Sequence, residues 1–319
     1  KHYSLCSLVL ALEINKIQTK DMKKLIISML GFILCLNLFS KTVIHAGYLF
    51  DVDSASLEPE MSIVVNEEFI EEVLVGYITP EPDDEYLDLT GYYLLPGLID
   101  MHVHLTSQSS SRAYLERTTL NDADYAIRAT KNAEKTLKAG FTSVRNLGDS
   151  SSITISLRNA ILDSTTIGPR IFSSGKTIST TGGHGDSTNS LNNQFTSDLG
   201  PKDGVINGKQ DAYKAVRHRY KEDADLIKIT ATGGVLSNAK DGQNPQMTTE
   251  EIQEIVNAAR DYGYKVAAHA HGSEGIKRAV NAGVDSIEHG TLMDNEGASL
   301  MREKGTYYVP TLLAGQWVA

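Results

Sequence analysis

The feature that most constrains the fold is residues 94–105, which read Leu-Leu-Pro-Gly-Leu-Ile-Asp-Met-His-Val-His-Leu. They predict a turn at the Pro-Gly pair and then a short apolar strand that ends in two histidines. Because successive side chains of a strand point to opposite faces, His102 and His104 share one face. Two imidazoles at the carboxyl end of a strand favour a metal site. A zinc-type ion needs about four ligands, so the others must come from elsewhere in the chain.

Beyond His104, short strand-like runs alternate with stretches of helical periodicity. Seven such strands follow one another, counted from the histidine strand. Regular alternation predicts a parallel sheet, and seven or eight strands predict a barrel. We therefore predict an α/β fold in which residues 91–319 form a (β/α)8 TIM barrel that is truncated after strand seven, with strand eight missing. Helices are expected at residues 122–139, 153–162, 210–223 and 248–262, and from residues 274 and 295.

Residues 41–90 have a different pattern. β-Branched and aromatic residues alternate there with turn residues such as Asp53 and Pro59, which is typical of strands. We expect a small, incomplete N-terminal β domain of the sandwich type. His45 lies in its first strand and is expected to be a packed or surface histidine rather than a ligand.

Residues 22–40 have the pattern of a secretory signal peptide. Met22 is followed by two lysines, an apolar run over residues 25–39 and the small residue Ser40, as in exported proteins. The run is shorter than the ~20 residues that a membrane span needs. We expect export to the periplasm or the extracellular space and no stable membrane span after cleavage, or a membrane anchor if the signal stays uncleaved. Residues 1–21 match neither a signal nor a folded element, and we expect them to be a non-native upstream extension.

Composition restricts the partners of this chain. Its formal net charge is −10 at pH 7, which argues against nucleic acid, because that ligand requires clustered Lys and Arg. Both cysteines, Cys6 and Cys35, precede residue 41, so no disulfide is expected in the mature protein. We expect a small-molecule or dipeptide substrate, and the composition allows an oligomer.

The carboxyl ends of the predicted strands carry most of the chemically capable side chains. In barrels of this kind, reactive groups lie at those ends. Strand one ends in the two histidines already named, and each later candidate follows a run that is otherwise apolar. These candidates are Lys228 on strand four, His269 and His271 on strand five, and His289 on strand six.

Four segments together resemble the amidohydrolase superfamily. Within it, they are similar to the branch of imidazolonepropionase-like and Xaa-Pro dipeptidase-like enzymes, and the similarity runs from about Thr42 to the end of the chain. One His-x-His pair alone would be weak evidence, but several motifs agree in order and spacing. The segments are Pro96-Gly-Leu-Ile-Asp-Met-His-Val-His, Ile227-Lys-Ile-Thr-Ala-Thr-Gly-Gly, Val266-Ala-Ala-His-Ala-His-Gly and Ile287-Glu-His-Gly-Thr.

The resemblance implies a site with two divalent metal ions, for which Zn²⁺ is expected. His102 and His104 would bind the more buried ion. Lys228 would be carboxylated by carbon dioxide and bridge both ions as a carbamate, while His269 and His289 would bind the second ion. The family also has an aspartate on strand eight that binds metal and accepts a proton, and no residue of this sequence matches it.

Plainer interpretations exist for several of these residues. A mid-strand lysine usually extends its amine to solvent or pairs with an acid, and an unmodified Lys228 would leave a one-metal site. His269 and His271 share a face, so either could be the ligand; the family pattern favours His269 and leaves His271 for the substrate. His184 lies in a glycine-rich segment, residues 179–186, that lacks the Lys-Ser/Thr of a phosphate loop. It resembles a substrate-contacting histidine of the same branch, or it is a turn histidine without a role. Arg145 and Tyr307 are weaker candidates for binding a carboxylate.

The first functional hypothesis is a metal-dependent amidohydrolase that hydrolyses the C–N bond of a small substrate, with a dipeptide favoured. A metal-bridged hydroxide would attack the carbonyl, with Lys228 and His289 as the catalytic residues present in the chain. The second hypothesis is a cyclic amidase of the imidazolonepropionase type, although Lys228 argues against it. The third is an inactive fragment that lacks the strand-eight aspartate.

Overall fold

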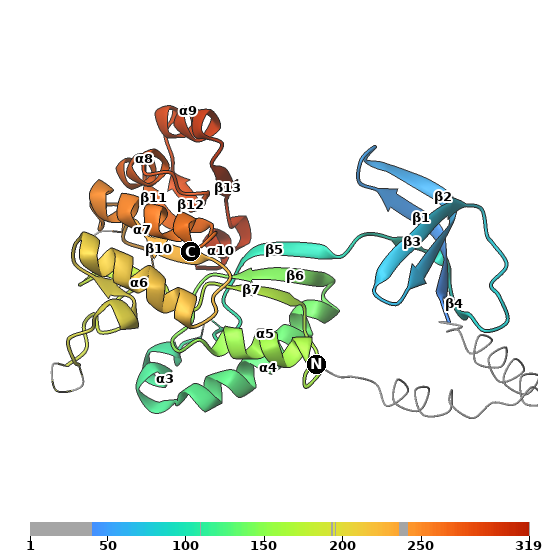
Figure 1. The fold of residues 1–319 in the computed structure, drawn as a ribbon, viewed down its shortest axis with the longest axis horizontal. Coiled ribbons are helices and arrows are strands. Elements are labelled where there is room, and N and C mark those ends of the chain that lie inside the picture. The colour runs from blue at the N-terminus through green and yellow to red at the C-terminus, as the bar shows by residue number, and fades with distance from the viewer. Residues whose placement is uncertain (1–39, 109, 193, 195, 236–241, 319) are drawn as a thin grey trace, which may run out of the picture. The chain divides into compact units, whose positions relative to one another are not determined.

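The computed structural model describes residues 40–108, 110–192, 194, 196–235 and 242–318 (Figure 1). The predicted extension (residues 1–21) and all but the last residue of the predicted signal peptide (residues 22–40) lie outside them. No helix within the described ranges is long and apolar enough to cross a membrane. The chain divides into two compact units between Pro96 and Gly97, and each is described by itself.

The first unit is one four-stranded sheet in the order β3-β2-β1-β4. Its small core contains Ala46, Met61 and Ile63. His45 is buried, its Nε2 lies 2.9 Å from the Ile78 carbonyl oxygen, and its ring stacks on another side chain, which confirms that it is a packed histidine. β1 pairs antiparallel with β2 and parallel with β4. The strands are β1 (Thr42–Asp51), β2 (Ser56–Asn66), β3 (Phe69–Val75) and β4 (Glu85–Leu94).

The second unit contains the seven predicted strands, and all their pairings are parallel. They form two sheets, β5-β6-β7 and β10-β11-β12-β13. Among the described residues no ladder joins β5 to β13, and the structure therefore shows the barrel strands without a closed barrel. The predicted α/β fold is confirmed. The strands are β5 (Leu98–Val103), β6 (Phe141–Asn146), β7 (Arg170–Ser173), β10 (Ile227–Thr230), β11 (Val266–Gly272), β12 (Ser286–Leu292) and β13 (Tyr307–Val309).

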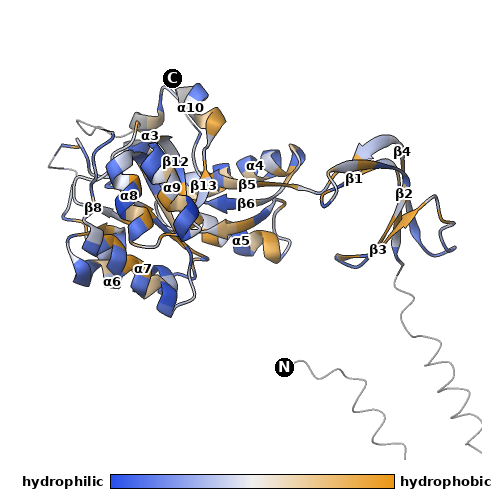
Figure 2. Ribbon diagram, turned by 90° about the horizontal axis from the view of Figure 1, so that it is seen from above, coloured by the Kyte–Doolittle hydropathy of each residue, from blue (hydrophilic) through white to orange (hydrophobic). Residues whose placement is uncertain are grey.

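Amphipathic helices cover these sheets, with α4 and α5 on the first and α6, α7 and α8 on the second (Figure 1). They are hydrophilic on one side and apolar on the other (Figure 2), because apolar residues recur at helical spacing. In α7, Thr248 and Glu251 form a capping box, which satisfies amides that the first turn leaves unpaired. The helices are α3 (Ala113–Thr119), α4 (Asp122–Lys138), α5 (Ile153–Leu162), α6 (Lys209–Lys221), α7 (Thr249–Asp261), α8 (Ser273–Asn281), α9 (Asn295–Lys304) and α10 (Leu312–Val318).

The long connection between β7 and α6 links the two sheets. Ile178 forms a parallel bridge with Ile229 of β10, and the Asp225 amide donates to the Ser173 carbonyl at 2.7 Å. The connection contains β8 (Ser179–Thr180), which pairs with β9 (Val205–Ile206), and the short helix η3 (Pro201–Asp203). It therefore carries His184 from the end of β8 toward the strand ends of the second sheet.

Candidate active site

Strand alternation places the predicted residues of β10 and β11 on the face of the sheet that is opposite to the helices. On β11, Ala268 and Ala270 pack into the core beneath the helices, so His269 and His271 point to the other face. On β10, Ile227 and Ile229 join the same core, which turns Lys228 inward. The apolar residues that face the helices thus hold the polar residues at the opposite face.

All six predicted site histidines form one continuous cluster of rings. Five lie on strands or at strand ends (His102, His104, His269, His271 and His289), and His184 lies in the loop after β8. Neighbouring ring centroids lie between 4.3 and 5.3 Å apart. His289 is central, because its ring lies 4.8 Å from that of His102 and 4.7 Å from that of His269. The structure therefore brings together the side chains of β5, β11 and β12 and of the loop after β8.

Hydrogen bonds to acceptor atoms fix which ring nitrogen of three histidines carries the hydrogen. His102 Nδ1 lies 2.9 Å from Glu288 Oε2, and His104 Nδ1 lies 3.1 Å from the carbonyl oxygen of Gly148. His269 instead directs Nε2 to the Gly233 carbonyl oxygen at 3.0 Å. A carboxylate or carbonyl oxygen only accepts, so these nitrogens donate. When the ring is neutral, the lone pair is on Nε2 of the first two histidines and on Nδ1 of His269.

Burial keeps the cluster neutral. It lowers the pKa of His104 and lowers that of His269 well below its usual value, and the positive charge of Lys228 adds to the effect in both. The pKa of His102 falls strongly for the same reasons. Burial, His102 and Lys228 together lower the pKa of His289 to about 2. Neutral imidazoles with available lone pairs are the form in which histidine binds a metal.

Lys228 is only 3% exposed, and its amine makes no hydrogen bond or ion pair with the residues that the structure describes. Burial lowers its pKa to about 8, an effect that Glu288 opposes and Arg145 reinforces. A lysine in such a setting carries an appreciable fraction of neutral amine near pH 7. Lys228 is therefore chemically suited to react with an electrophile.

His289 departs from strand alternation. Ser286 and Glu288 already occupy the inner face of β12, so a regular strand would turn His289 outward. Its φ of +70° interrupts the alternation, where the register with β11 shifts, and brings the ring into the cluster. Thr311 Oγ1 lies 2.7 Å from its Nδ1, and the Tyr308 hydroxyl donates to its carbonyl oxygen at 3.0 Å. Left-handed backbone is costly for residues other than glycine, and these two contacts hold it.

His184 and His271 lie at the edge of the cluster. The ring of His184 stacks on that of His269, and its Nδ1 is buried with no hydrogen-bond partner among the described residues. Burial, Lys228 and His271 lower the pKa of His184 to about 4. His271 Nδ1 lies 2.9 Å from Thr291 Oγ1. The His271 side chain is partly exposed. Both histidines can therefore face a bound substrate. The other four are fixed by hydrogen bonds on the side of the ring that faces away from the cluster.

Gly234 sets the position of His184, which leads to a specific expectation. A Cβ on Gly234 would lie 2.4 Å from His184 Cε1, so Gly234→Ala must displace that ring. If His184 contacts the substrate, KM should rise about tenfold, since one lost hydrogen bond costs ~1.4 kcal/mol. Steady-state kinetics measures this. Gly200→Ala is the control, because nothing lies within 4 Å of its Cβ, and an equal KM for both variants would contradict a role of His184 in binding.

Arg145 has partners within the protein, and Tyr307 is exposed. The Arg145 guanidinium pairs with Glu288 at 2.6 Å and donates from Nε to the Met101 carbonyl oxygen at 2.7 Å. These partners occupy it, so it is not available to a substrate carboxylate. Tyr307 is 76% exposed on β13. Sequence reasoning also missed Glu288, although a carboxylate within an apolar strand was a signal that could have identified it.

The donor set fits a two-metal centre only if Lys228 takes part. Among the described residues, no three side chains of histidine, cysteine, aspartate and glutamate form a group that could hold a metal ion. Each predicted ligand set has two histidines and needs Lys228 as its third member, and a lysine acquires ligand oxygens only when it is carboxylated. The four neutral histidines and the buried amine match that requirement.

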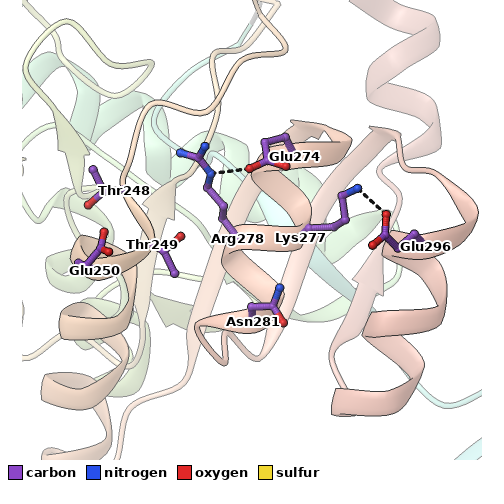
Figure 3. Close-up of a pocket in the computed structure, with 8 residues that line it drawn as sticks. All are labelled: Thr248, Thr249, Glu250, Glu274, Lys277, Arg278, Asn281 and Glu296. Carbon is purple, nitrogen blue, oxygen red and sulfur yellow. Dashed lines mark hydrogen bonds and ion pairs between the residues drawn. The ribbon is translucent and has the colours of Figure 1, made fainter.

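A cavity of about 630 Å³, which none of these histidines lines, lies between α7, α8 and α9 (Figure 3). Its charged side chains pair with one another: Arg278 with Glu274 at 2.8 Å, and Lys277 with Glu296 at 2.8 Å. Such paired charges leave little capacity for a ligand. A second cavity, of about 370 Å³, lies beside β5 and includes His104 in its lining.

Comparisons with known proteins agree with this chemistry. The amidohydrolase family model matches residues 93–316. A crystal structure of a Xaa-Pro dipeptidase with methionine bound in its active site has 52% identity and a TM-score of 0.84, over 87% of this chain and 68% of that one. Ochratoxinase from Aspergillus niger is 30% identical over 85% of this chain and 58% of its own length. Imidazolonepropionase from Idiomarina loihiensis is 25% identical over 85% of this chain and 68% of its own length.

The family model spans both strand sheets of the second unit, and the resemblance drawn from the motifs is thereby confirmed. The chain covers little more than half of the length of ochratoxinase. The chain belongs to the amidohydrolase family.

Proposed function

We propose that this chain is a metal-dependent hydrolase of the C–N bond of a small amide, and that its substrates are Xaa-Pro dipeptides. The observation that carries the proposal is the cluster of neutral histidines beside the desolvated Lys228. The similarity to a Xaa-Pro dipeptidase at 52% identity supports the substrate class.

Five residues would hold the metal ions. His102 and His104 would bind one ion, His269 and His289 the other, and a carboxylated Lys228 would bridge them. Divalent ions, with Zn²⁺ favoured by the histidine donors, would lower the pKa of a bound water to ~7 and polarise the amide carbonyl.

The chain's own side chains perform the remaining tasks. The neutral form of the Lys228 amine is the form that can take up carbon dioxide. Hydrogen bonds from His102, His104 and His269 to Glu288 and to two backbone carbonyls keep the opposite nitrogens aimed into the cluster. His184 and His271 keep polar nitrogen atoms near the edge of the cluster, where they can bind the substrate.

The alternative is hydrolysis of a cyclic amide, as the similarity to imidazolonepropionase suggests. The buried lysine favours the dipeptidase, because a bridging carbamate serves a two-metal site. A protein without catalytic activity is the remaining alternative, and any measured turnover would exclude it.

A substrate comparison with and without metal tests the proposal. The full-length protein is incubated with Met-Pro, with Met-Ala and with a cyclic amide, each before and after treatment with a chelator and after Zn²⁺ is restored. We expect Met-Pro to be cleaved at least about tenfold faster than the cyclic amide, with turnover lost on chelation and recovered with Zn²⁺, since the metal supplies the hydroxide. Turnover that survives complete metal removal, or a preference for the cyclic amide, would contradict it.

A further inference from the structure

A buried carboxylate lies beneath the histidine cluster. Glu288 is 0% exposed, and an isolated charge in such a place is very unfavourable unless it is paired and hydrogen-bonded. It has three partners. Arg145 Nη2 and the Ser286 hydroxyl both donate to Oε1 at 2.6 Å, and His102 Nδ1 donates to Oε2 at 2.9 Å.

The two oxygens of Glu288 thus have different partners. Arg145 and Ser286 occupy Oε1, which leaves Oε2 for the histidine. Arg145 is itself held, because its Nε donates to the Met101 carbonyl oxygen at 2.7 Å and its Nη1 to Ser286 Oγ at 3.1 Å. The side chains therefore connect β5, β6 and β12, and the carboxylate cannot turn away from His102 without losing its other bonds.

We propose that Glu288, held by Arg145, is a positioning residue that fixes the tautomer and the orientation of His102. Because the carboxylate only accepts, His102 must carry its hydrogen on Nδ1, and Nε2 keeps the lone pair that faces the cluster. Carboxylates that receive the second N–H of a metal-binding imidazole orient the ring and raise its basicity. The proposal rests on the proposed function in one respect, that His102 is a metal ligand.

A second ion pair, with a buried arginine and a partly exposed acid, offers a control. Arg158 on α5 pairs with Asp225 at 2.7 Å, and Asp225 also accepts the Ser173 amide. Among the described residues, neither Arg158 nor Asp225 bonds to a histidine of the cluster. Asp225→Asn and Glu288→Gln both neutralise the acid of an arginine pair, and only Glu288→Gln changes a partner of His102.

The experiment measures two properties of the full-length protein. In the metal-free form, ¹⁵N NMR of the histidine rings reports the His102 tautomer, assigned by its loss in His102→Asn. In the reconstituted form, Zn²⁺ titration against a competing chelator gives the affinity. For Glu288→Gln we expect a mixture of His102 tautomers and a zinc affinity roughly 10–100-fold weaker. Asp225→Asn should retain the wild-type tautomer and affinity.

The outcomes separate the two proposals. An unchanged tautomer and an unchanged zinc affinity in Glu288→Gln would reduce the Glu288–Arg145 pair to a structural contact and overturn the inference. If the wild-type protein binds no zinc, the proposed function fails, while the tautomer measurement still decides the role of Glu288. Should Glu288→Gln not fold, the double variant Arg145→Met/Glu288→Met replaces it. It removes the acceptor of His102 and both charges of the pair, so that no buried charge is left unpaired, and an unchanged tautomer and affinity in that variant would equally overturn the inference.

Discussion

Replacing Lys228 with alanine should lower kcat/KM for an Xaa-Pro dipeptide by about 10³-fold and lower the metal content of the purified protein. The amine is buried next to neutral histidines, and burial lowers its pKa to about 8. If it carries the bridging carbamate, its loss removes a ligand from both ions. Metal-assisted activation of water is worth several kcal/mol, and ~4 kcal/mol corresponds to three powers of ten. Steady-state kinetics and elemental analysis on the same preparation measure the two effects.

Controls distinguish this chemistry from a loss of folding. Lys265 on the surface, whose side chain is 79% exposed and pairs with Asp285, is the matched lysine, and Lys265→Ala should keep activity within about twofold because exposed ion pairs contribute little. Thermal unfolding of Lys228→Ala should remain cooperative, since the variant also relieves the desolvation of a buried amine. Unimpaired turnover of Lys228→Ala would exclude a carbamate from the mechanism.

The barrel elements could be predicted because their signals are local. Isoleucines on both sides of Lys228 and alanines around His269 indicated strands whose one face is buried. Helix α4 was expected at residues 122–139 and runs over Asp122–Lys138, since its apolar periodicity ends at a glycine with φ +94°. The β8–β9 pair was not predicted. It joins Ser179 and Thr180 to Val205 and Ile206, residues that are far apart in the chain and carry no local pattern of contact.

The candidate site divides in the same way. His102, His104 and His269 follow from alternation along a strand, whereas His289 does not. Alternation places Glu288 inward and His289 outward, and His289 was assigned to the site by its place at the carboxyl end of a strand and by the motif resemblance. The left-handed backbone at His289 is held by Tyr308 and Thr311. These residues come from the next strand and the segment after it, so no pattern near His289 predicts this conformation.

Acid should destabilise the metal-free protein already between pH 6.5 and 5, above the range in which most carboxylates titrate. Burial lowers the pKa of six histidines in the cluster, to about 4 for His184 and to about 2 for His289, whereas in the unfolded chain each titrates near ~6.5. The unfolded state therefore binds more protons throughout this window, and stability rises with pH. The stabilising contribution is complete above pH ~6.5 and is lost progressively as the pH falls toward the folded-state values. The other four are His102, His104, His269 and His271.

Each such histidine adds up to ~1.4 kcal/mol per pH unit to the slope once its unfolded form is protonated. Several together should therefore cost the metal-free protein a few kcal/mol between pH 6.5 and 5. Urea unfolding midpoints at half-unit steps, in chelator, measure the slope. His184→Asn should make the slope shallower by no more than one histidine's share, since it removes one titrating ring from the edge of the cluster. A midpoint that stays constant from pH 7.5 to 5 would mean that these rings titrate in the folded protein as they do in the unfolded chain. Burial would then not be what keeps the cluster neutral.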